Sequence, residues 1–311
     1  MKAKTNRGRI VAISVQGEVS APVMGTPYRV GYDGVARVLP ATGGIVYNVR
    51  LGDSVYGWAG DHVEPGVSTK DKDERINAAY NTLSCVGNRA TVVSGDAKGS
   101  AGVVTGKHGG IEHVLVDFEP GVLDRLAVGD KVLVRAYGQG LEIDGFPEIK
   151  VMNCDPDLFD RMGVEVADAT GRPAAAGKAG RGRRAKLSVP VVAEVPAYLM
   201  GSGLGSSTAH SGDYDITTQD PPVLSRLELD RLRFGDLVAI RDASSFYGRS
   251  YRHGAVIVGV VIHSDSKIAG HGPGVTTLLT CNHGEILPRI DPKANLALFL
   301  GLRPESEFRS H

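Results

Sequence analysis

Glycine is the feature that most restricts how this chain can fold. The sequence has 41 glycines in 311 residues, nearly twice the average share, and they are spread along the chain rather than clustered. Glycine permits turns, bulges and close backbone approaches that other residues disfavour, and all-β folds need these more often than helical folds do. The sequence therefore predicts a mainly β protein.

The apolar pattern leads to the same prediction. Short runs of strand length, rich in β-branched residues and bounded by Gly, Pro, Asn or Asp, recur at 10–15, 36–39, 45–49, 90–93, 114–118, 131–136, 187–194, 237–240, 255–262, 276–280 and 297–300. Helical patterns are limited to 72–83, to 156–162 with Asp155 as the N-cap, and to a turn or two within 224–232.

These elements are expected to form two barrel-like or sandwich β parts with a few short helices. The N-terminal β domain covers 1–155 and includes a small barrel at about 90–137, where a glycine-rich hairpin leads to a turn at Gly129 and Asp130. The C-terminal β domain covers 156–311. It includes a basic, alanine- and glycine-rich segment at about 168–186 that is expected to be a flexible loop.

Charge and composition argue against several classes of protein. Lysine plus arginine equals aspartate plus glutamate, at 35 each, so no net positive field favours nucleic acid or an anionic membrane. No apolar run approaches the ~20 residues of a membrane helix, and the N-terminal apolar stretch is too short for a signal-peptide core. The three cysteines are widely separated, which fits a reducing compartment and predicts a cytoplasmic protein.

The segment 254–274 is the strongest candidate for a functional site. A run of β-branched residues at 255–262 predicts a buried central strand, and it ends at His263 and Asp265. His271 follows between glycines, which allow a ligand to approach the main chain. Two histidines and a carboxylate at the mouth of a strand can form a metal site or an acid–base pair. The alternative is a polar loop whose histidines bind backbone groups.

Two further strings carry residues of the same kind. Asp213 and Asp215 are two residues apart, so on an extended chain they would share a face and could converge on one cation. His62 and Glu64 have the same spacing, which is common in metal and acid–base sites. Each string is also compatible with an ordinary surface turn.

A third group of residues is suited to binding a substrate. Arg249 could bind a substrate carboxylate, with Tyr251 beside it, although the pair also fits an ordinary hairpin loop. Lys98 and the amides of the glycine loop at Gly272 and Gly274 could hold an anionic ligand.

Several of these strings together resemble an uncharacterised family of bacterial and archaeal proteins, known as a domain of unknown function with N- and C-terminal parts. The strings are 61–66, 93–99, 105–110, 136–140, 200–203, 212–215, 263–265 and 270–274. More remotely, 254–263 with 270–272 is similar to the acetamidase/formamidase family, which implies that His263 is a metal or active-site residue. The carboxylates of that family's Gly-Asp-Gly-Glu string are missing here.

These observations lead to one leading hypothesis and one alternative. The leading hypothesis is a metal-assisted hydrolase of a C–N bond in a small amide or cyclic amide, in which a divalent metal polarises the carbonyl. The metal ligands would come from His62, His263, His271, Asp213 and Asp215, and His263, Asp265 and Glu64 would be catalytic. The alternative is a non-catalytic protein that binds a small anionic ligand. The many strand edges and glycines also favour a homo-oligomer.

Overall fold

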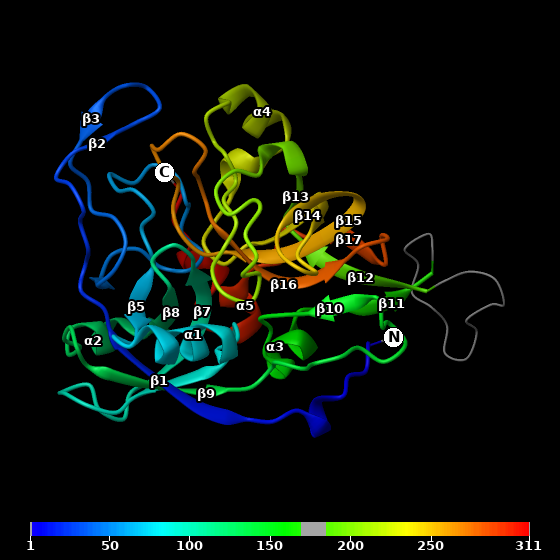
Figure 1. The fold of residues 1–311 in the computed structure, drawn as a ribbon, viewed down its shortest axis with the longest axis horizontal. Helices are drawn as coiled ribbons and strands as arrows, with labels where there is room; N and C mark the ends of the chain where they lie inside the picture. Colours follow the sequence, from blue (N-terminus) through cyan, green and yellow to red (C-terminus); the bar gives the residue numbers. More distant parts are fainter. Residues whose placement is uncertain (1, 169–184, 311) are drawn as a thin grey trace.

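The computed structural model describes residues 2–168 and 185–310 (Figure 1). Within these residues the protein is mainly β, as predicted, and its α-helices are short. The expected flexible loop at 168–186 lies almost entirely outside the described residues.

Six strands of the first half close into a barrel. They are β1 (Ile13–Val19), β5 (Gly66–Lys70), β6 (Arg89–Val92), β7 (Ala101–His108), β8 (His113–Phe118) and β9 (Lys131–Ala136). Their order is β1-β9-β6-β7-β8-β5, and β5 pairs again with β1 to close the ring. The predicted barrel at 90–137 is therefore completed by two earlier strands. Short strand β4 (Ile45–Val46) extends β5.

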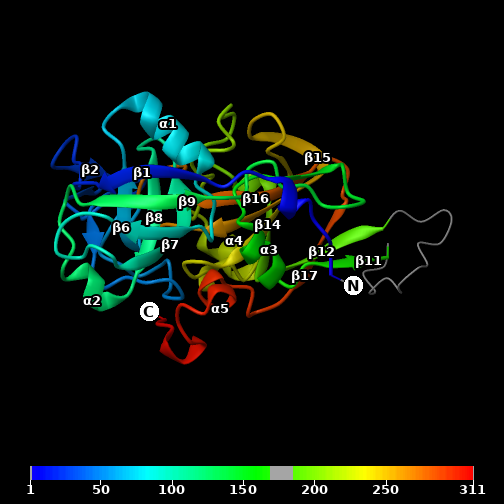
Figure 2. The same cartoon turned by 90° about the horizontal axis from the view of Figure 1, so that it is seen from below.

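The barrel is filled with small β-branched side chains and is covered by helix α1 (Glu74–Leu83) (Figure 2). Tyr80 of α1 is fully buried, and its hydroxyl lies 2.7 Å from Thr69 Oγ1. The ring lies directly on β1 at Gly17, where a Cβ would come within 2.6 Å of it. Any other residue at this position would push the helix off the barrel.

A five-stranded sheet, formed by the second half of the chain together with β10, has the order β10-β16-β15-β14-β13. Its strands are β10 (Ile149–Val151), β13 (Ala193–Pro196), β14 (Leu237–Ser244), β15 (Ser250–Val261) and β16 (Val275–Cys281). A smaller sheet contains β11 (Glu165–Ala167), β12 (Lys186–Val191) and β17 (Ile286–Ile290). The large core between these layers contains most of the buried aliphatic side chains of the second half.

The remaining elements are short. They are the hairpin β2 (Arg29–Val30) and β3 (Ala36–Arg37), the helices α2 (Pro120–Leu123), α3 (Pro156–Arg161), α4 (Pro221–Arg226) and α5 (Leu296–Leu300), and 3-10 turns at Arg7–Arg9, Ala197–Leu199, Leu229–Arg231 and Glu305–Glu307. The helices predicted near 72–83 and 156–162 are confirmed, and Asp155 accepts a hydrogen bond from Asp157 N as the expected N-cap. The strand predicted at 297–300 is wrong, because this segment forms α5.

The two halves meet where β7 lies against β16 and the end of β15. Lys107 N donates to Thr276 Oγ1 at 3.0 Å, and the same hydroxyl donates back to Lys107 O at 3.1 Å. Next to this pair, a Cβ on Gly106 would lie 2.3 Å from Ile262 Cγ2. This close contact sets the end of β7 beside the end of β15.

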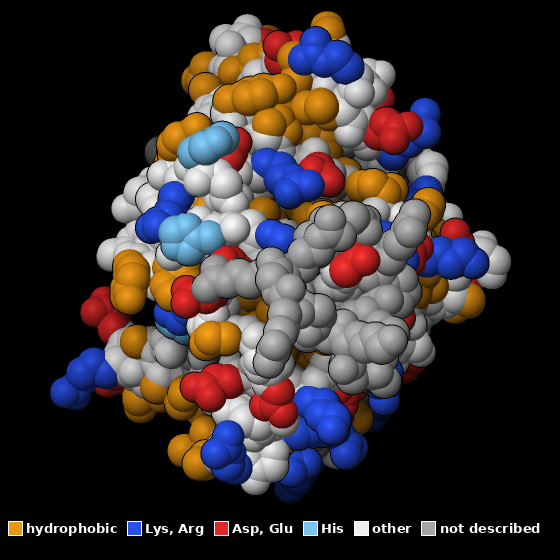
Figure 3. Space-filling model, turned by 90° about the vertical axis from the view of Figure 1, so that its right-hand side faces the viewer, with side chains coloured by type: hydrophobic (Ala, Val, Ile, Leu, Met, Phe, Trp, Pro, Cys, Tyr) orange, Lys and Arg blue, Asp and Glu red, His pale blue; other side chains and the backbone are white. Residues whose placement is uncertain are grey.

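The surface seen from the side carries charges of both signs, interspersed rather than gathered into one field (Figure 3). None of the helices that the structure describes is both long and apolar enough to cross a membrane.

Candidate metal centre

Six histidine and aspartate side chains from both halves of the chain converge at this junction. We call them the His/Asp cluster: His62, His108, Asp213, Asp215, His263 and His271. The first comes from the loop before β5 and the second ends β7, whereas the others belong to loops around α4, β15 and β16. All except His271 are buried.

Two overlapping sets of ligand atoms lie within this cluster. His62, Asp215 and His263 form one set, and His108, Asp213 and His263 form the other, with the ligand atoms of each set within 4.8 Å of one another. His263 Nε2 lies 2.8 Å from Asp213 Oδ2 and 3.6 Å from Asp215 Oδ1.

The exposed edge of the cluster is formed by His271. Its Nδ1 lies 2.9 Å from Asp215 Oδ2 and 3.0 Å from His62 Nε2. The six side chains thus offer more nitrogen and oxygen donors than the three protein ligands that a catalytic zinc site normally uses.

The orientation of three histidines is set by a separate oxygen acceptor behind each ring. Nδ1 of His62 lies 3.2 Å from Asp61 Oδ2, and Nδ1 of His263 lies 2.9 Å from the carbonyl oxygen of Ser264. Nδ1 of His108 lies 2.5 Å from Glu64 Oε1. An Nδ1–H that donates to such an acceptor leaves the Nε2 lone pair free, which is the arrangement that fixes histidine ligands in metal proteins.

Glu64 is fully buried and is held by several donors. Its carboxylate accepts hydrogen bonds from Gly43 N at 2.8 Å and from Ser68 Oγ, and it contacts Nδ1 of both His108 and His113. Burial alone would raise the pKa of Glu64, but the two histidines hold that pKa well below its ordinary value. Glu64 therefore stays ionised and orients His108, one layer behind the cluster.

The converging atoms are not satisfied by one another. Asp213 Oδ2, Asp215 Oδ2 and His263 Nε2 are buried and have no hydrogen-bond partner of acceptable geometry, although the first and third lie only 2.8 Å apart. Unpaired buried polar atoms are costly and are expected where an ion or ligand completes the site. Burial lowers the pKa of His263, but the two aspartates outweigh this and hold it well above its ordinary value.

The backbone around the cluster is specialised to bring these groups together. His62 has a φ of 54°, in the left-handed region that a histidine seldom adopts. A Cβ on Gly274 would lie 1.9 Å from Asp213 Oδ2 and 2.3 Å from His263 Nε2. Gly109 N donates to the other oxygen of Asp213 at 2.8 Å, which fixes that carboxylate from behind.

A cavity of about 300 Å³ opens onto one side of the cluster. His62, His108, Asp213, Asp215 and His271 form its floor, and Arg249 lies in its wall. The cluster is thus accessible to a small molecule.

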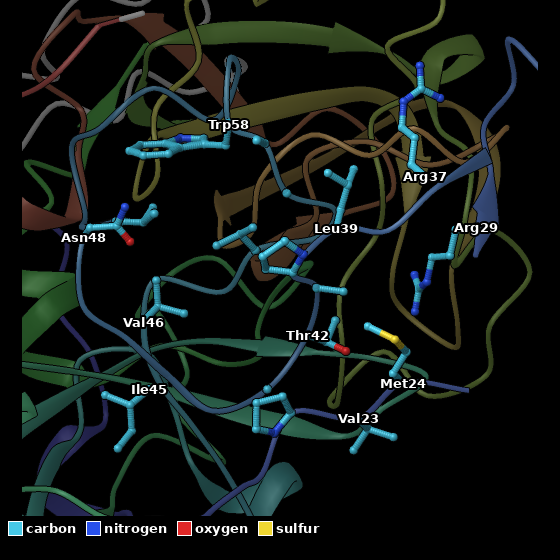
Figure 4. Close-up of a pocket in the computed structure, with 18 of the residues that line it drawn as sticks. Val23, Met24, Arg29, Arg37, Leu39, Thr42, Ile45, Val46, Asn48 and Trp58 are labelled. Atoms are coloured by element: carbon cyan, nitrogen blue, oxygen red, sulfur yellow. The ribbon is translucent and has the colours of Figure 1, made fainter. Parts of the chain in front are cut away.

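A larger cavity of about 490 Å³ lies elsewhere (Figure 4). It is lined by apolar side chains such as Leu39, Val46 and Trp58, and by the segment that carries Val23 and Met24. Within the described chain this cavity contains no group of three potential metal ligands, so the smaller cavity is the candidate site.

The structure brings together most of the residues singled out in the sequence. His62, His263, His271, Asp213 and Asp215, the predicted metal ligands, all belong to the cluster, and Arg249 lines the cavity. Gly274 supports the cluster itself, because it makes room for the ligand atoms. Gly272 lies against the carbonyl oxygen of Ile216, where a Cβ would come within 1.8 Å.

Other predicted site residues lie outside the cavity. The Asp265 carboxylate accepts a hydrogen bond from Thr218 and lies 3.4 Å from Lys267 Nζ, so it faces away from the cluster. Tyr251 is 66% exposed on β15, and Lys98 is exposed between β6 and β7. Neither contributes to the cavity wall.

His108 and His113 are the functional candidates that sequence reasoning missed. His108 ends a strand and is followed by Gly109 and Gly110, the same combination of strand end, histidine and glycine that singled out 263–274. That signal was present in the sequence. His113 has no such signal, since it is a buried strand residue that contacts Glu64 and Ser20.

Comparison with known proteins identifies the family. Residues 28–160 match the N-terminal domain of unknown function DUF4438, and residues 179–300 match its C-terminal counterpart. The chain belongs to the DUF4438 family. A solved structure titled "Crystal structure of TM1086" is 49% identical, with a TM-score of 0.85, and the alignment covers 94% of this chain and 98% of that one. No curated protein matches the chain. None of these matches is an acetamidase or formamidase, so that similarity stays a prediction.

Proposed function

We propose that the His/Asp cluster binds a divalent transition metal and that the protein is a metal-assisted hydrolase. The observation that carries this proposal is the orientation of His62, His108 and His263. Each Nδ1 faces an oxygen acceptor outside the cluster. The Nε2 atoms of His62 and His263 face other cluster side chains, His271 Nδ1 at 3.0 Å and Asp213 Oδ2 at 2.8 Å. Three rings held in this way, together with unsatisfied aspartate oxygens, match a metal site with its outer hydrogen-bonding layer.

The donor set restricts the metal. Imidazole nitrogens combined with carboxylate oxygens suit zinc, iron, nickel or copper, whereas magnesium and calcium prefer oxygen alone. The two ligand sets share His263, and its Nε2 can bind only one ion. We therefore expect one ion per chain in one of these sets, with the donors of the other set partly spare.

Spare donors beside the ion support hydrolysis. A bound divalent metal would polarise a carbonyl and lower the pKa of a water molecule. If the ion occupies the His62, Asp215 and His263 set, then Asp213 and His108 remain at its side to hold or accept a proton. This geometry replaces Asp265 as the expected base, because its carboxylate faces Thr218 and Lys267. A small amide or cyclic amide is the substrate we propose, in keeping with the size of the cavity.

A non-catalytic binding protein for a small anion is the second candidate. Arg249 in the cavity wall favours it, since a buried guanidinium would bind an anion whether or not a reaction follows. The two candidates differ in whether amide hydrolysis depends on the metal.

Elemental analysis of protein purified without chelator tests the metal. We expect close to one equivalent of a transition metal in the wild type and its loss in His263→Ala and His108→Ala. His253→Ala is the matched control, because His253 lies in β15, the strand that leads to His263, but its side chain is 89% exposed. Its one ion pair among the described residues is with Asp242. Metal content in the wild type no higher than in His263→Ala would contradict the proposal.

Turnover is tested on the same preparations. Release of ammonia or of a carboxylate from a panel of small linear and cyclic amides should disappear on chelation, return on adding the metal, and be absent in His263→Ala. A bound metal with no hydrolysis across the panel would favour the binding protein.

A further inference from the structure

Arg249 is a buried cation without an anionic partner. The residue is 3% exposed and lies in the wall of the cavity that opens onto the His/Asp cluster. Its side chain makes one long hydrogen bond, from Nη2 to the carbonyl oxygen of Ser211 at 3.3 Å, while Nε is buried with no partner. No carboxylate of the described residues lies within ion-pair distance of it.

Arg303 is also buried, but it has an anionic partner. Its Nε also lacks a hydrogen bond, but Nη1 of Arg303 lies 2.8 Å from Asp53 Oδ1 and donates to Leu51 O at 2.9 Å. The difference is therefore the ion pair with Asp53, which makes this guanidinium structural. Burying a charge without such a partner is unfavourable, and burial lowers the pKa of Arg249. The carboxylates of Asp213, Asp215 and Glu112 raise that pKa from a distance, but none is paired with the guanidinium. The backbone nevertheless fixes Arg249 in place, with N donating to Ser206 O at 2.7 Å and O accepting from Gly205 N at 2.8 Å.

The rest of the cavity wall is suited to a polar molecule. Ser202, Ser206, Thr208, Ser211 and Glu112 line it, and none of the described residues contributes an aliphatic side chain or an aromatic ring other than imidazole. Among the residues that the structure describes, Arg249 is the only lysine or arginine in this wall. At about 300 Å³ the cavity is at the small end of ligand sites.

We propose that Arg249 binds a carboxylate group of the substrate, so that the substrate class is a small amide or cyclic amide that carries a free carboxylate. The guanidinium offers Nε and an Nη as a planar fork, which matches the two oxygens of a carboxylate. The inference rests on the proposed function in placing the reacting C–N bond at the metal. The carboxylate would then anchor the other end of the molecule and orient the bond toward the His/Asp cluster.

Calorimetric titration with matched ligands tests this inference. Succinamate carries a carboxylate and an amide, succinamide is its neutral counterpart, and inorganic phosphate is a different oxyanion. We expect succinamate to bind the metal-loaded wild type about tenfold or more tightly than succinamide, since a charge-assisted pair is at stake. Arg249→Gln should lose about that factor for succinamate and leave succinamide unchanged.

Two further variants provide the controls. Arg252→Gln removes an exposed arginine three residues further along and should bind succinamate like the wild type. Arg249→Lys keeps the charge but not the fork, and should bind with intermediate affinity. Equal binding of succinamate by wild type and Arg249→Gln, no carboxylate binding at all, or tighter Arg249-dependent binding of phosphate would each overturn the inference.

Thermal unfolding distinguishes a binding role from a structural one. If Arg249 is kept for a ligand, Arg249→Gln removes an unpaired buried charge, and its unfolding temperature should stay the same or rise. A clear fall, together with lost binding, would mean that Arg249 supports the fold and would overturn the proposal. Repeating the titrations with chelator separates the two proposals. The hydrolase proposal fails if elemental analysis finds no metal or if no amide is hydrolysed, whereas carboxylate binding that depends on Arg249 and persists without metal supports the anion site independently.

Discussion

At the scale of single residues, Gly274 shows how tightly the cluster is packed. An alanine Cβ there would lie well inside the contact distance of Asp213 Oδ2 and His263 Nε2. We expect Gly274→Ala to displace these two ligand atoms and to lower metal affinity by about tenfold or more, with little loss of secondary structure. Metal competition titrations with circular dichroism measure both. Gly121→Ala, where a Cβ meets nothing within 4 Å, is the control, and the prediction fails if both variants bind metal equally well.

Asp236 is a buried carboxyl whose titration should change the free energy of unfolding with pH. Burial raises its pKa to about 7, although Asn295 and the backbone N–H of Arg233 stabilise the charged form. The native protein therefore holds a proton between about pH 4 and 7 that the unfolded chain has released, so this group's contribution to stability falls as pH rises through that window.

The Asp236→Asn variant isolates that effect. Its free energy of unfolding is measured by urea titration with chelator present. Between pH 5 and 7, roughly the window between the pKa of an unfolded aspartate and that of native Asp236, it should decline less than the free energy of the wild type. Only the slope is compared, because the amide also changes the hydrogen bonds. Identical slopes would show that Asp236 is not protonated in this range.

At the scale of elements, α5 depends on one capping residue. Asn295 Oδ1 accepts from Ala297 N at 2.8 Å, and Nδ2 donates to Phe234 O and to Asp236 Oδ1. Asn295→Ala removes the cap and leaves two buried acceptors without this donor, which should cost about 2–4 kcal/mol in the free energy of unfolding. Lys293→Ala, at an exposed neighbouring site, should cost almost nothing in the same urea titration. An equally small cost for both would contradict the capping role.

The same helix explains where sequence prediction failed. The run at 297–300 is apolar and short, and such a run fits a strand or a buried helix equally well. The deciding signals lay outside it, in Asn295 as the N-cap and in Gly301, which ends the helix with a φ of 67°. By contrast, 131–136 and 114–118 were predicted almost to the residue, because turn residues bound them on both sides.

At the scale of the whole molecule, only part of the site could be predicted. The strings around 62, 213 and 263 stand out because histidines and carboxylates follow strands or glycines. Their meeting could not be predicted from spacing, because His62 and His271 are 209 residues apart. They touch because the loop of His62 is hydrogen-bonded to the loop after β15, with Val63 N donating to Ser264 Oγ at 2.8 Å. Asp265 is two residues after His263, so the sequence predicts that both belong to the site. Residues two apart share a face only within a strand, and Asp265 lies beyond the strand end and binds Thr218 instead.

One exposed apolar surface is the candidate contact for the expected homo-oligomer. Eight of the seventeen exposed large hydrophobic side chains of the described residues lie between Val23 and Tyr47, around the projecting β2–β3 hairpin (Figure 1). Such patches often mark contacts between chains. We predict an oligomer by light scattering, and a shift to monomer on replacing Tyr28 and Val30 with serine. Ile76→Ser on α1 should leave the mass unchanged, and a monomeric wild type would refute the prediction.

Metal binding should stabilise the entire chain, because the His/Asp cluster takes ligands from both halves. A ligand that binds only the native state adds about 2.7 kcal/mol when its free concentration is a hundredfold above Kd. Calorimetry should therefore show one transition that falls by several degrees when chelator is added to the wild type. His263→Ala should melt at the same temperature with metal or chelator, whereas His253→Ala should respond as the wild type does. A chelator effect confined to a separate, partial transition would mean that the cluster forms within one half alone. If chelator lowers the melting temperature of His263→Ala as much as that of the wild type, the cluster is not the cause of the effect.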